Sequence, residues 1–560
     1  MHLLIIGAVA ALALTLRWMV SAESFWTDEL HSAWAASGTW SQVGQRASQG
    51  NQQPLFFHLL WLWARASSTG LLSTLPTESL WRGFVILPSV LAAAGMTWSV
   101  LRATGSQLGA AAAGLVMALD SNAIFFGTEL RPYAWVMFFS LVAVDAASRW
   151  YDNRTAAAWW TVHAAAAAAG LMHLTALLSL SAWVMWVTLM DIFRPGDSLQ
   201  TTGNLSSGGH VGESRRGHRS EEAIAPRRRF HLRRRHGLVT IGWCCLLSWQ
   251  LNSQQAVWKA KENWDAFGTP TSPADLLTLW PWLSLGLIPA VAMLIAIHLV
   301  PRQWRRRRGP MIDSRTAQQP VAWIALGVSI LSAVAAYGLA ESGLLPIWHR
   351  RYLVAGLPML VWWFGWCIAS IANPRHSSAA VHRGGRLSRA VAVVAVAVSC
   401  ILLLWQQNTL QQLGRGNVRW VRRGEGWREA VAWISQQTTP HERVWVDPGL
   451  IEQPPGASEL VERPDALYLK YVVNGPYQFP TEIETVAVGR SGSRRWLDLA
   501  ESGEPPTDWI ISRRRIHDLH DGINQQSRDV SKIATPPFRV RRFGGVWVAG
   551  ASHRRNDTAD

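Results

Sequence analysis

The chain has 560 residues, of which 49% are hydrophobic, 34 are tryptophan and only 16% are charged. The apolar residues fall in blocks of about 16–25 residues, the length that a helix needs to cross a hydrocarbon core. Tryptophan at the ends of such blocks is typical of the membrane interface. The net charge of +16 comes from basic residues clustered in short loops between the blocks, which argues for membrane topology and against nucleic-acid binding. We therefore expect a polytopic α-helical membrane protein.

The apolar blocks predict about eleven membrane-spanning helices. They lie near 2–20, 83–101, 107–126, 132–148, 156–171, 174–192, 237–251, 276–300, 320–340, 351–371 and 389–405. The first block lacks the basic n-region of a signal peptide, so we expect it to remain as an uncleaved helix. The cysteines lie inside apolar blocks without metal-type spacing and are expected to be packing residues.

The charges of the loops predict the orientation. Basic clusters between blocks, such as those at 227–237 and 302–309, all fall on one side of the predicted topology. The positive-inside rule assigns that side to the cytoplasm. The chain then emerges outside after the first helix, and an odd number of spans places 406–560 outside as well. We expect a bacterial-type inner (plasma) membrane protein with these outer parts extracytoplasmic.

The domain organisation follows from this topology. Residues 1–405 are predicted to form the transmembrane domain, and its outward loop 21–82 holds the candidate catalytic residues. The cytoplasmic insert at 193–236 is polar and rich in Gly and Ser, which predicts disorder. Residues 406–560 are predicted to form a small extracytoplasmic α/β domain, from helical spacing at 426–437 and strand-like runs at 442–449, 508–512 and 544–550.

The outward segments gather ionisable residues beside apolar ones. Asp28 and Glu29 lie in FWTDELHSAW, and the Trp-rich segment 51–65 that follows is predicted to lie along the interface. Ionisable groups at membrane depth are costly and are therefore functional candidates. A carboxylate can take a proton from an attacking hydroxyl. Arginine binds phosphate in a bidentate fork and offsets the charge that develops on a leaving phosphate. Such a set suits group transfer from a lipid-linked phosphate.

The order of several segments resembles the GT-C membrane glycosyltransferases, in particular the bacterial protein mannosyltransferase and aminoarabinose transferase kind. The segments are TDEL after the first helix, QPLFFHLLWLW, WRGFVILPSVLAAAGMTW, TELRPYAW, His173 in a helix break, and WHRRYLVAGLPML. The resemblance covers most of residues 20–370. It implies a GT-C-like fold, a polyprenyl-phosphate sugar donor in the outer leaflet, and inverting transfer of a hexosyl or pentosyl group to a hydroxyl or amine of a glycan, lipid or protein acceptor.

The resemblance also implies roles for individual residues. Asp28 matches the catalytic base or acceptor-positioning acid, and Glu29 its companion. Arg131 matches a helix-end arginine near the donor site, and Arg351 and Tyr352 match an Arg-Tyr pair at the lipid phosphate. Arg350, beside them on the outer side, is a further candidate for donor-phosphate binding. The further candidates for substrate contacts are Glu129, Tyr133, His31, His58, His173 and His349. Relatives often have Lys-Pro-Pro-Leu or His-Pro-Pro-Leu where this chain has Gln52-Gln53-Pro54-Leu55, which argues against an aminoarabinose donor and a lipid A acceptor.

Other readings of these residues remain open. Asp28 could cap a helix over 29–36, Glu129 and Arg131 could form a structural ion pair, and the histidines could be buried bundle residues. No metal site is predicted because the spacing of His31 and His58 is not diagnostic, although a divalent metal stays open. A lipid-linked sugar flippase or transporter is the rival class, and a surface-polysaccharide polymerase or ligase with a diphosphate-linked donor is a further one. Polar residues gathered at one face, without internal repeats, favour the enzyme.

Overall fold

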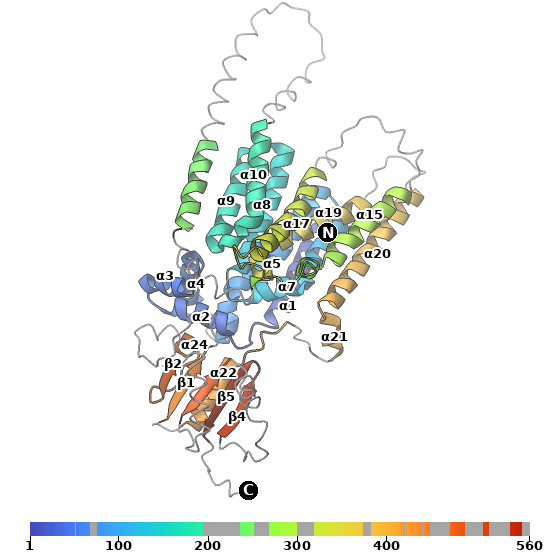
Figure 1. Ribbon diagram of the computed structural model, residues 1–560. Helices are drawn as coiled ribbons and strands as arrows, with labels where there is room; N and C mark the ends of the chain where they lie inside the picture. Colours follow the sequence, from blue (N-terminus) through green and yellow to red (C-terminus); the bar gives the residue numbers. More distant parts are fainter. Residues whose placement is uncertain are drawn as a thin grey trace, which may run out of the picture.

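The computed structural model describes residues 1–50, 52–67, 75–193, 236–250, 252, 268–299, 319–372, 382–415, 417, 421–438, 442–448, 471–487, 508–513 and 538–551. These residues form a body of long helices and a smaller sheet domain at one end of it (Figure 1). Most of the predicted insert, 194–235, lies outside the described residues.

Helices occupy every apolar block that the sequence predicts. The long helices of the body are α1 His2–Trp18, α5 Thr77–Thr104, α6 Gln107–Leu119, α7 Ser121–Thr128, α8 Tyr133–Asn153, α9 Ala156–Met172, α10 Leu177–Phe193, α15 Ile288–Leu299, α17 Gln319–Glu341, α19 Gly356–Ala372 and α20 His382–Gln406, with a further helix over 236–250. Within the described residues, 4 helices are long and apolar enough to cross a membrane, or 5 if the bent pair α6–α7 is one span. The helical membrane architecture is thus confirmed, and the count of about eleven crossings stays a prediction.

The predicted single helix over 107–126 is wrong, because the chain breaks at Asp120. Helices α6 and α7 meet at 58°. Asp120 has an extended backbone, and its Oδ1 accepts a hydrogen bond of 2.8 Å from the N–H of Ala123, so it caps α7. The break leaves the last carbonyls of α6 without helical partners. Buried Arg17 of α1 donates to two of them, Met117 O at 3.0 Å and Ala118 O at 3.4 Å.

Helices α6 and α19 approach closely through small residues. A Cβ on Gly109 would lie 2.6 Å from the carbonyl oxygen of Gly365, and a Cβ on Gly365 would lie 2.7 Å from the Cβ of Ala113. Both helices carry a small residue four positions on, Ala113 and Ala369. This spacing is the one by which membrane helices bring their backbones together.

The substitution Gly365→Ala is therefore expected to lower the thermal midpoint, with a loss of about 1–3 kcal/mol from overpacking. Gly338→Ala in α17 is the matched control, because nothing lies within 4 Å of a Cβ built there. Alanine favours a helix over glycine, so the control is expected to keep or raise the midpoint. Both variants can be compared by thermal unfolding in the same lipid or detergent, and equal midpoints would contradict the close approach.

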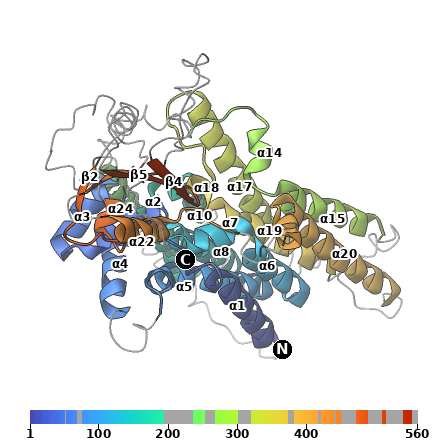
Figure 2. The ribbon, with the colours of Figure 1, turned by 90° about the horizontal axis from the view of Figure 1, so that it is seen from below.

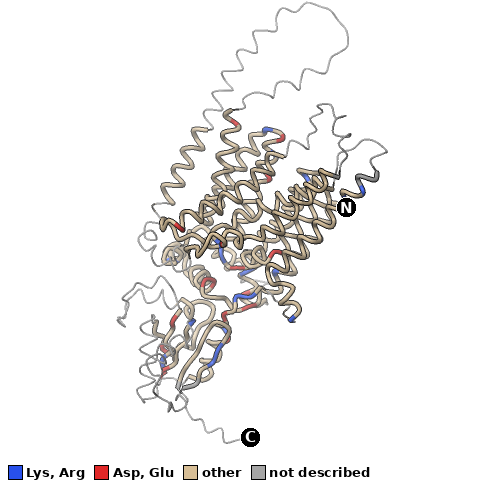
Figure 3. The backbone as a smooth tube through the Cα atoms, turned by 45° about the vertical axis from the view of Figure 1, so that its right-hand side comes forward, with Lys and Arg blue, Asp and Glu red and all other residues tan. Residues whose placement is uncertain are grey.

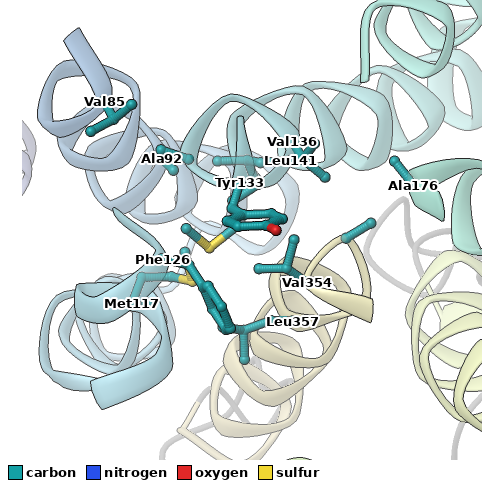
Figure 4. Close-up of a cluster of buried hydrophobic side chains, with 14 of the residues drawn as sticks. Val85, Ala92, Met117, Phe126, Tyr133, Val136, Leu141, Ala176, Val354 and Leu357 are labelled. Carbon is teal, nitrogen blue, oxygen red and sulfur yellow. The ribbon is translucent and has the colours of Figure 1, made fainter. Parts of the chain in front are cut away.

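The body also has an apolar core directly beneath the residues considered below. Figure 4 shows Met117, Phe126 and Tyr133 turned toward Val354 and Leu357, all of them buried. These side chains come from α6, α7 and α8 on one side, and from the start of α19 and the residues just before it on the other. The core therefore fixes how the ends of these helices lie relative to one another.

The outward loop and the tail form the other layer. The loop contains α2 Thr27–Ser37, α3 Trp40–Gln49 and α4 Pro54–Ser67. In the described part of the tail, α21 Thr409–Gly414, α22 Trp427–Gln437 and α24 Tyr471–Asn474 accompany a 5-stranded sheet of order β2-β1-β3-β5-β4, with β1 Arg443–Asp447, β2 Glu484–Ala487, β3 Trp509–Ser512, β4 Phe538–Phe543 and β5 Val546–Ala551. β1 is parallel to β2 and β3, and β5 is antiparallel to β3 and β4. The predicted helix and three predicted strands are confirmed, while β2 and β4 were not predicted.

Hydrogen bonds attach the tail to the start of α2. Figure 2 shows α22 and α24 lying over the outward loop. The Tyr477 hydroxyl accepts a hydrogen bond of 2.8 Å from the N–H of Phe25 and donates one of 2.6 Å to Glu78. The Glu425 carboxylate accepts from both the N–H and the hydroxyl of Thr27, at 2.8 and 2.7 Å. Residues far apart in sequence thus hold the first turn of α2 in place. Figure 3 shows charged residues concentrated at this junction between the helices and the sheet domain.

Candidate active site

Asp28 lies in the first turn of α2 and does not cap it. The helix begins at Thr27, and Trp26 is its extended N-cap residue with φ −88° and ψ 170°. The interpretation of Asp28 as the cap of a helix over 29–36 is therefore wrong. The capping contact comes from Glu29, whose Oε2 accepts from the N–H of Trp26 at 3.4 Å. The Asp28 carboxylate is thus left for other partners.

Those partners are two arginines from distant parts of the chain. Asp28 Oδ1 lies 3.4 Å from Nη2 of Arg131, and Asp28 Oδ2 lies 3.3 Å from Nη1 of Arg351. The Asp28 side chain is 23% exposed, so a substrate can reach it. Arg131 pairs with Asp28 and no ion pair with Glu129 is found in the described residues, which overturns the alternative of a Glu129–Arg131 bridge.

The charges around Asp28 keep it ionised. Burial by itself would raise the pKa of Asp28, but Arg131, Arg351 and Arg513 outweigh this effect and hold the pKa below its ordinary value. Arg513 follows strand β3, so the tail contributes to the field at Asp28. At neutral pH the group is a carboxylate and can accept a hydrogen bond or a proton.

Several buried N–H groups in this cluster have no acceptor. Among the described residues, Arg131 Nε and Nη1, Arg423 Nη1 and Trp26 Nε1 are buried without a hydrogen-bond partner. Arg131 touches Asp28, Arg423 lies 3.3 Å from Glu29, and Trp26 stands two residues before Asp28. Buried donors without partners are rare in native proteins and costly. A set of cationic and indole N–H donors is complementary to an oxyanion such as a phosphate.

Glu29 makes a different set of contacts from its neighbour. Its fully buried carboxylate takes a bidentate pair from Arg82 of α5, with Nε to Oε1 at 2.9 Å and a second close bond to Oε2. It also accepts from the N–H of Leu130 at 2.9 Å. Burial would raise the pKa of Glu29, but Arg423 and Arg82 hold it below its ordinary value. These bonds join α2 to α5 and to the segment that carries Arg131, so Glu29 positions the site.

Glu129 is another buried carboxyl group, but its pKa is raised, whereas those of Asp28 and Glu29 are lowered. Burial and the nearby Asp28 raise the pKa of Glu129 to about 8, so it is protonated at neutral pH. In the unfolded chain the pKa of this group is near its ordinary value of 4.5. Between these two pH values the folded state binds the extra proton, and the stability contributed by the neutral form falls as pH rises through this window.

We therefore expect Glu129→Gln to remove this pH dependence. The amide cannot ionise, so the thermal midpoint of the variant relative to wild type should rise between about pH 5 and pH 8. Thermal unfolding of both proteins at pH 5, 6.5 and 8 measures the difference. A difference that stays constant with pH would show that the fold does not hold Glu129 protonated.

Aromatic rings and histidines also surround Arg351. The ring centroids of Tyr133 and His173 are 5.4 Å apart, and those of His173 and Tyr352 are 5.8 Å apart. Arg351 Nη2 donates to the Tyr352 hydroxyl at 3.2 Å, and the N–H of Arg351 donates to His349 Nδ1 at 3.2 Å. Burial and the arginines lower the pKa of His173 to about 3 and that of His349 to about 4. Both histidines are neutral, so they do not compete with Arg351 for an anion.

Three further predicted residues make their close contacts with groups other than Asp28, although His31 lies one helical turn from Asp28 and within electrostatic range of its carboxylate. His31 packs against Trp34 and Tyr471, and its ring nitrogen is 3.1 Å from Arg46 O. His58 contacts Pro54 O at 2.8 Å. Arg350 donates to Thr278 O at 2.7 Å. In the described part of the chain no group of three His, Cys, Asp or Glu could hold a metal ion.

A cavity of about 600 Å³ lies beside the Arg351 segment. Phe125 and Phe126 of α7, His349 and Arg350, and Arg422 from the tail are in its wall. The break at Asp120 places α7 there, because a straight continuation of α6 would carry the two phenylalanines elsewhere. The cavity thus combines an apolar wall with a cationic one.

Sequence reasoning did not find Arg82, Arg423, Arg513 or Glu425. Arg82 had a signal, because a charged residue in a 28-residue apolar helix is a candidate by default. The other three lie in the tail, and only the folded contacts bring them to α2.

A scan against protein-family models and a search of curated proteins found no match. Among solved structures, the chain is similar to ArnT from Cupriavidus metallidurans in the apo state, with 12% identity over 98% of this chain and 97% of that one and a TM-score of 0.47. The same protein bound to undecaprenyl phosphate aligns with a TM-score of 0.46 at 12% identity, covering 98% of each chain. The archaeal oligosaccharyltransferase AglB from Archaeoglobus fulgidus, in complex with an inhibitory peptide and a dolichol-phosphate, aligns over 91% of this chain and 69% of that one, with 11% identity and a TM-score of 0.43. Both proteins are GT-C glycosyltransferases, the superfamily that the sequence resembles. TM-scores below 0.5 do not define what this chain binds, so its function is argued from its own site.

Proposed function

We propose that this chain is an integral-membrane glycosyltransferase that moves a sugar from a polyprenyl-phosphate donor to an acceptor at the extracytoplasmic face. The observation that carries the proposal is the partly exposed Asp28 carboxylate held between Arg131 and Arg351 at 3.4 and 3.3 Å. Arg131 keeps two buried nitrogens without an acceptor in the described residues. One carboxylate beside unsatisfied cationic donors suits an acceptor nucleophile and a phosphate leaving group.

The proposed reaction is a single displacement. Asp28 accepts the proton of the acceptor hydroxyl or amine while that oxygen or nitrogen bonds to the anomeric carbon. The bond between the anomeric carbon and the phosphate oxygen breaks, and its electron pair leaves with the polyprenyl phosphate. Arg131 and Arg351 neutralise the charge that develops on the phosphate. Attack opposite to the leaving group inverts the anomeric configuration, whether the group is a hexosyl or a pentosyl.

The two arginines couple the basicity of Asp28 to the binding of the donor. While both pair with Asp28 they weaken it as a base, because they hold its pKa low. A donor phosphate that draws Arg131 and Arg351 toward itself relieves Asp28, and its pKa rises toward the ordinary value. Proton transfer is thereby favoured once the donor is in place.

The proposed function also assigns a place to the donor lipid and a membrane side to each domain. The cavity of about 600 Å³ beside His349 and Arg350 suits the first isoprene units and the phosphate. Residues 1–405 are the catalytic membrane domain with about eleven crossings, and 406–560 is the extracytoplasmic domain that holds α2. The protein is placed in an inner (plasma) membrane, with Asp28 and the tail on the outer side.

Binding of sugar-free polyprenyl phosphate tests the donor site. Arg131→Ala and Arg351→Ala are each expected to weaken binding about 10–100-fold, since a charge-assisted hydrogen bond contributes about 1.5–3 kcal/mol. Arg149→Ala is the control, because its exposed side chain pairs with Asp145 at the far end of α8. Titration of the purified protein in nanodiscs gives the dissociation constants. Equal binding of uncharged polyprenol, or unchanged binding in both site variants, would contradict the phosphate site.

A further inference from the structure

A second cavity, of about 780 Å³, lies between the outward loop and the tail domain. One wall comes from α3 and the end of α2, and the other from the segment after α24. It is separate from the cavity lined by His349 and Arg350, with which it shares no lining residue. Nothing in the proposed reaction uses it.

Amide side chains dominate this cavity. Gln45 and Gln49 enter from α3, and Asn474 and Gln478 from the tail. None of these four amides makes a side-chain hydrogen bond to another described residue; Gln45, Gln49 and Gln478 are exposed to solvent, and Asn474 is half-buried. Each amide offers two donors and one acceptor oxygen. Uncommitted amides on two facing walls are complementary to a ligand that carries many hydroxyl groups.

The remaining lining residues limit the chemical class of ligand that the cavity can bind. Phe479 is half-buried and offers a ring face, and Thr39 and Thr481 add hydroxyls. Arg46 and Arg65 are the charged residues of the lining, which contains no Asp or Glu among the described residues. A neutral or acidic ligand is therefore favoured over a cationic one.

Side-chain packing holds the walls of the cavity against helix α2. Tyr471 of α24 packs edge-to-face on His31 at 5.5 Å and lies 6.3 Å from the Trp34 ring. The Arg46 guanidinium stacks 4.8 Å from Trp34 and donates to its carbonyl at 2.8 Å. This packing fixes both walls relative to α2 before any ligand enters, which lowers the cost of binding.

Helix α2 joins this cavity to the proposed catalytic residue. Asp28 lies in its first turn, while Trp34 and Ser37 line the cavity at its other end. At 1.5 Å per residue the separation along the axis is about 9–14 Å. An extended molecule of a few sugar units is long enough to span this distance.

We propose that this cavity is the acceptor subsite and that it holds a neutral or acidic glycan chain. The chain would place its terminal hydroxyl at Asp28 while a few of its sugar residues hydrogen-bond to the amides of α3 and the tail. The inference rests on the proposed function and names the acceptor as a glycan rather than a lipid or a protein. In this proposal the tail domain takes part in acceptor binding.

Glycan binding by the full-length protein in nanodiscs tests the inference. An array of bacterial surface glycans that includes neutral, acidic and cationic chains is probed with wild type, and affinities are then measured for the bound chains. The triple variant Gln45→Ala/Gln49→Ala/Gln478→Ala is expected to lose at least tenfold in affinity. Gln411→Ala is the matched control, because this amide is exposed like the three replaced glutamines but lies on α21, outside the cavity.

The outcomes separate this inference from the proposed function. Absence of binding to every glycan, preference for the cationic chains, or equal affinity of the triple variant and wild type would overturn the acceptor subsite. Polyprenyl phosphate binding in the triple variant is expected to match wild type, since Arg131 and Arg351 are untouched. Loss of the donor site with retained glycan binding would instead refute the proposed function alone.

Discussion

Replacing Asp28 by asparagine is expected to lower the rate of sugar transfer by about 10²–10⁴-fold, the range that a general base contributes. The amide keeps the size and shape of the side chain but cannot take the proton of the acceptor. It also removes the negative charge that pairs with Arg131 and Arg351. Both arginines then become available to the phosphate, so polyprenyl phosphate should bind at least as tightly as in wild type.

Turnover and donor binding measured side by side check this prediction. Asp145→Asn is the control, because its carboxylate pairs with Arg102 and Arg149 away from the site. Full activity of Asp28→Asn would refute the proton-accepting role. Lost activity together with lost donor binding would instead indicate that Asp28 only holds the arginines in place.

The second large effect concerns stability. Glu29→Gln is expected to destabilise the fold by about 3–5 kcal/mol, because removal of one member of a buried ion pair leaves the other uncompensated. The side chains of Glu29, Arg82 and Arg423 are all 0% exposed. The substitution leaves the charges of Arg82 and Arg423 without their carboxylate partner. It also weakens the contact between α2 and α5.

Thermal and denaturant unfolding of Glu29→Gln can be compared with Glu429→Gln. Glu429 pairs with Arg428 at 2.7 Å, but the two side chains are 43% and 42% exposed, so this pair contributes at most about 1 kcal/mol. A midpoint like that of the control, combined with lost turnover, would make Glu29 a catalytic residue and refute its structural role.

The sequence predicted the helices well because apolar length and loop charge are local properties. It missed the break at Asp120, since a single carboxylate in an apolar block gives no sign of whether it caps a new helix or faces a cavity. The capping bond to Ala123 is local, but Arg17 and Gln407, which also interact with Asp120, come from distant elements that the fold brings together.

The candidate site was predicted in part for the same reason. Asp28, Arg131 and Arg351 were expected to lie together because the predicted topology put all three at the outer side, and the structure places them in contact. His31 and His58 shared that side but are held by local packing instead. The contributions of Arg423 and Arg513 depend on how the tail docks on α2, which no spacing in the sequence specifies.

The most direct test of the proposed function is the release of sugar from a panel of radiolabelled polyprenyl-phosphate sugars by the purified protein in lipid, beside Asp28→Asn and Arg351→Ala. The proposal predicts that wild type consumes at least one monophosphate donor and that both variants fall by about 100-fold or more. Consumption of diphosphate-linked donors alone, or transport of the lipid-linked sugar across the bilayer without its cleavage, would contradict it.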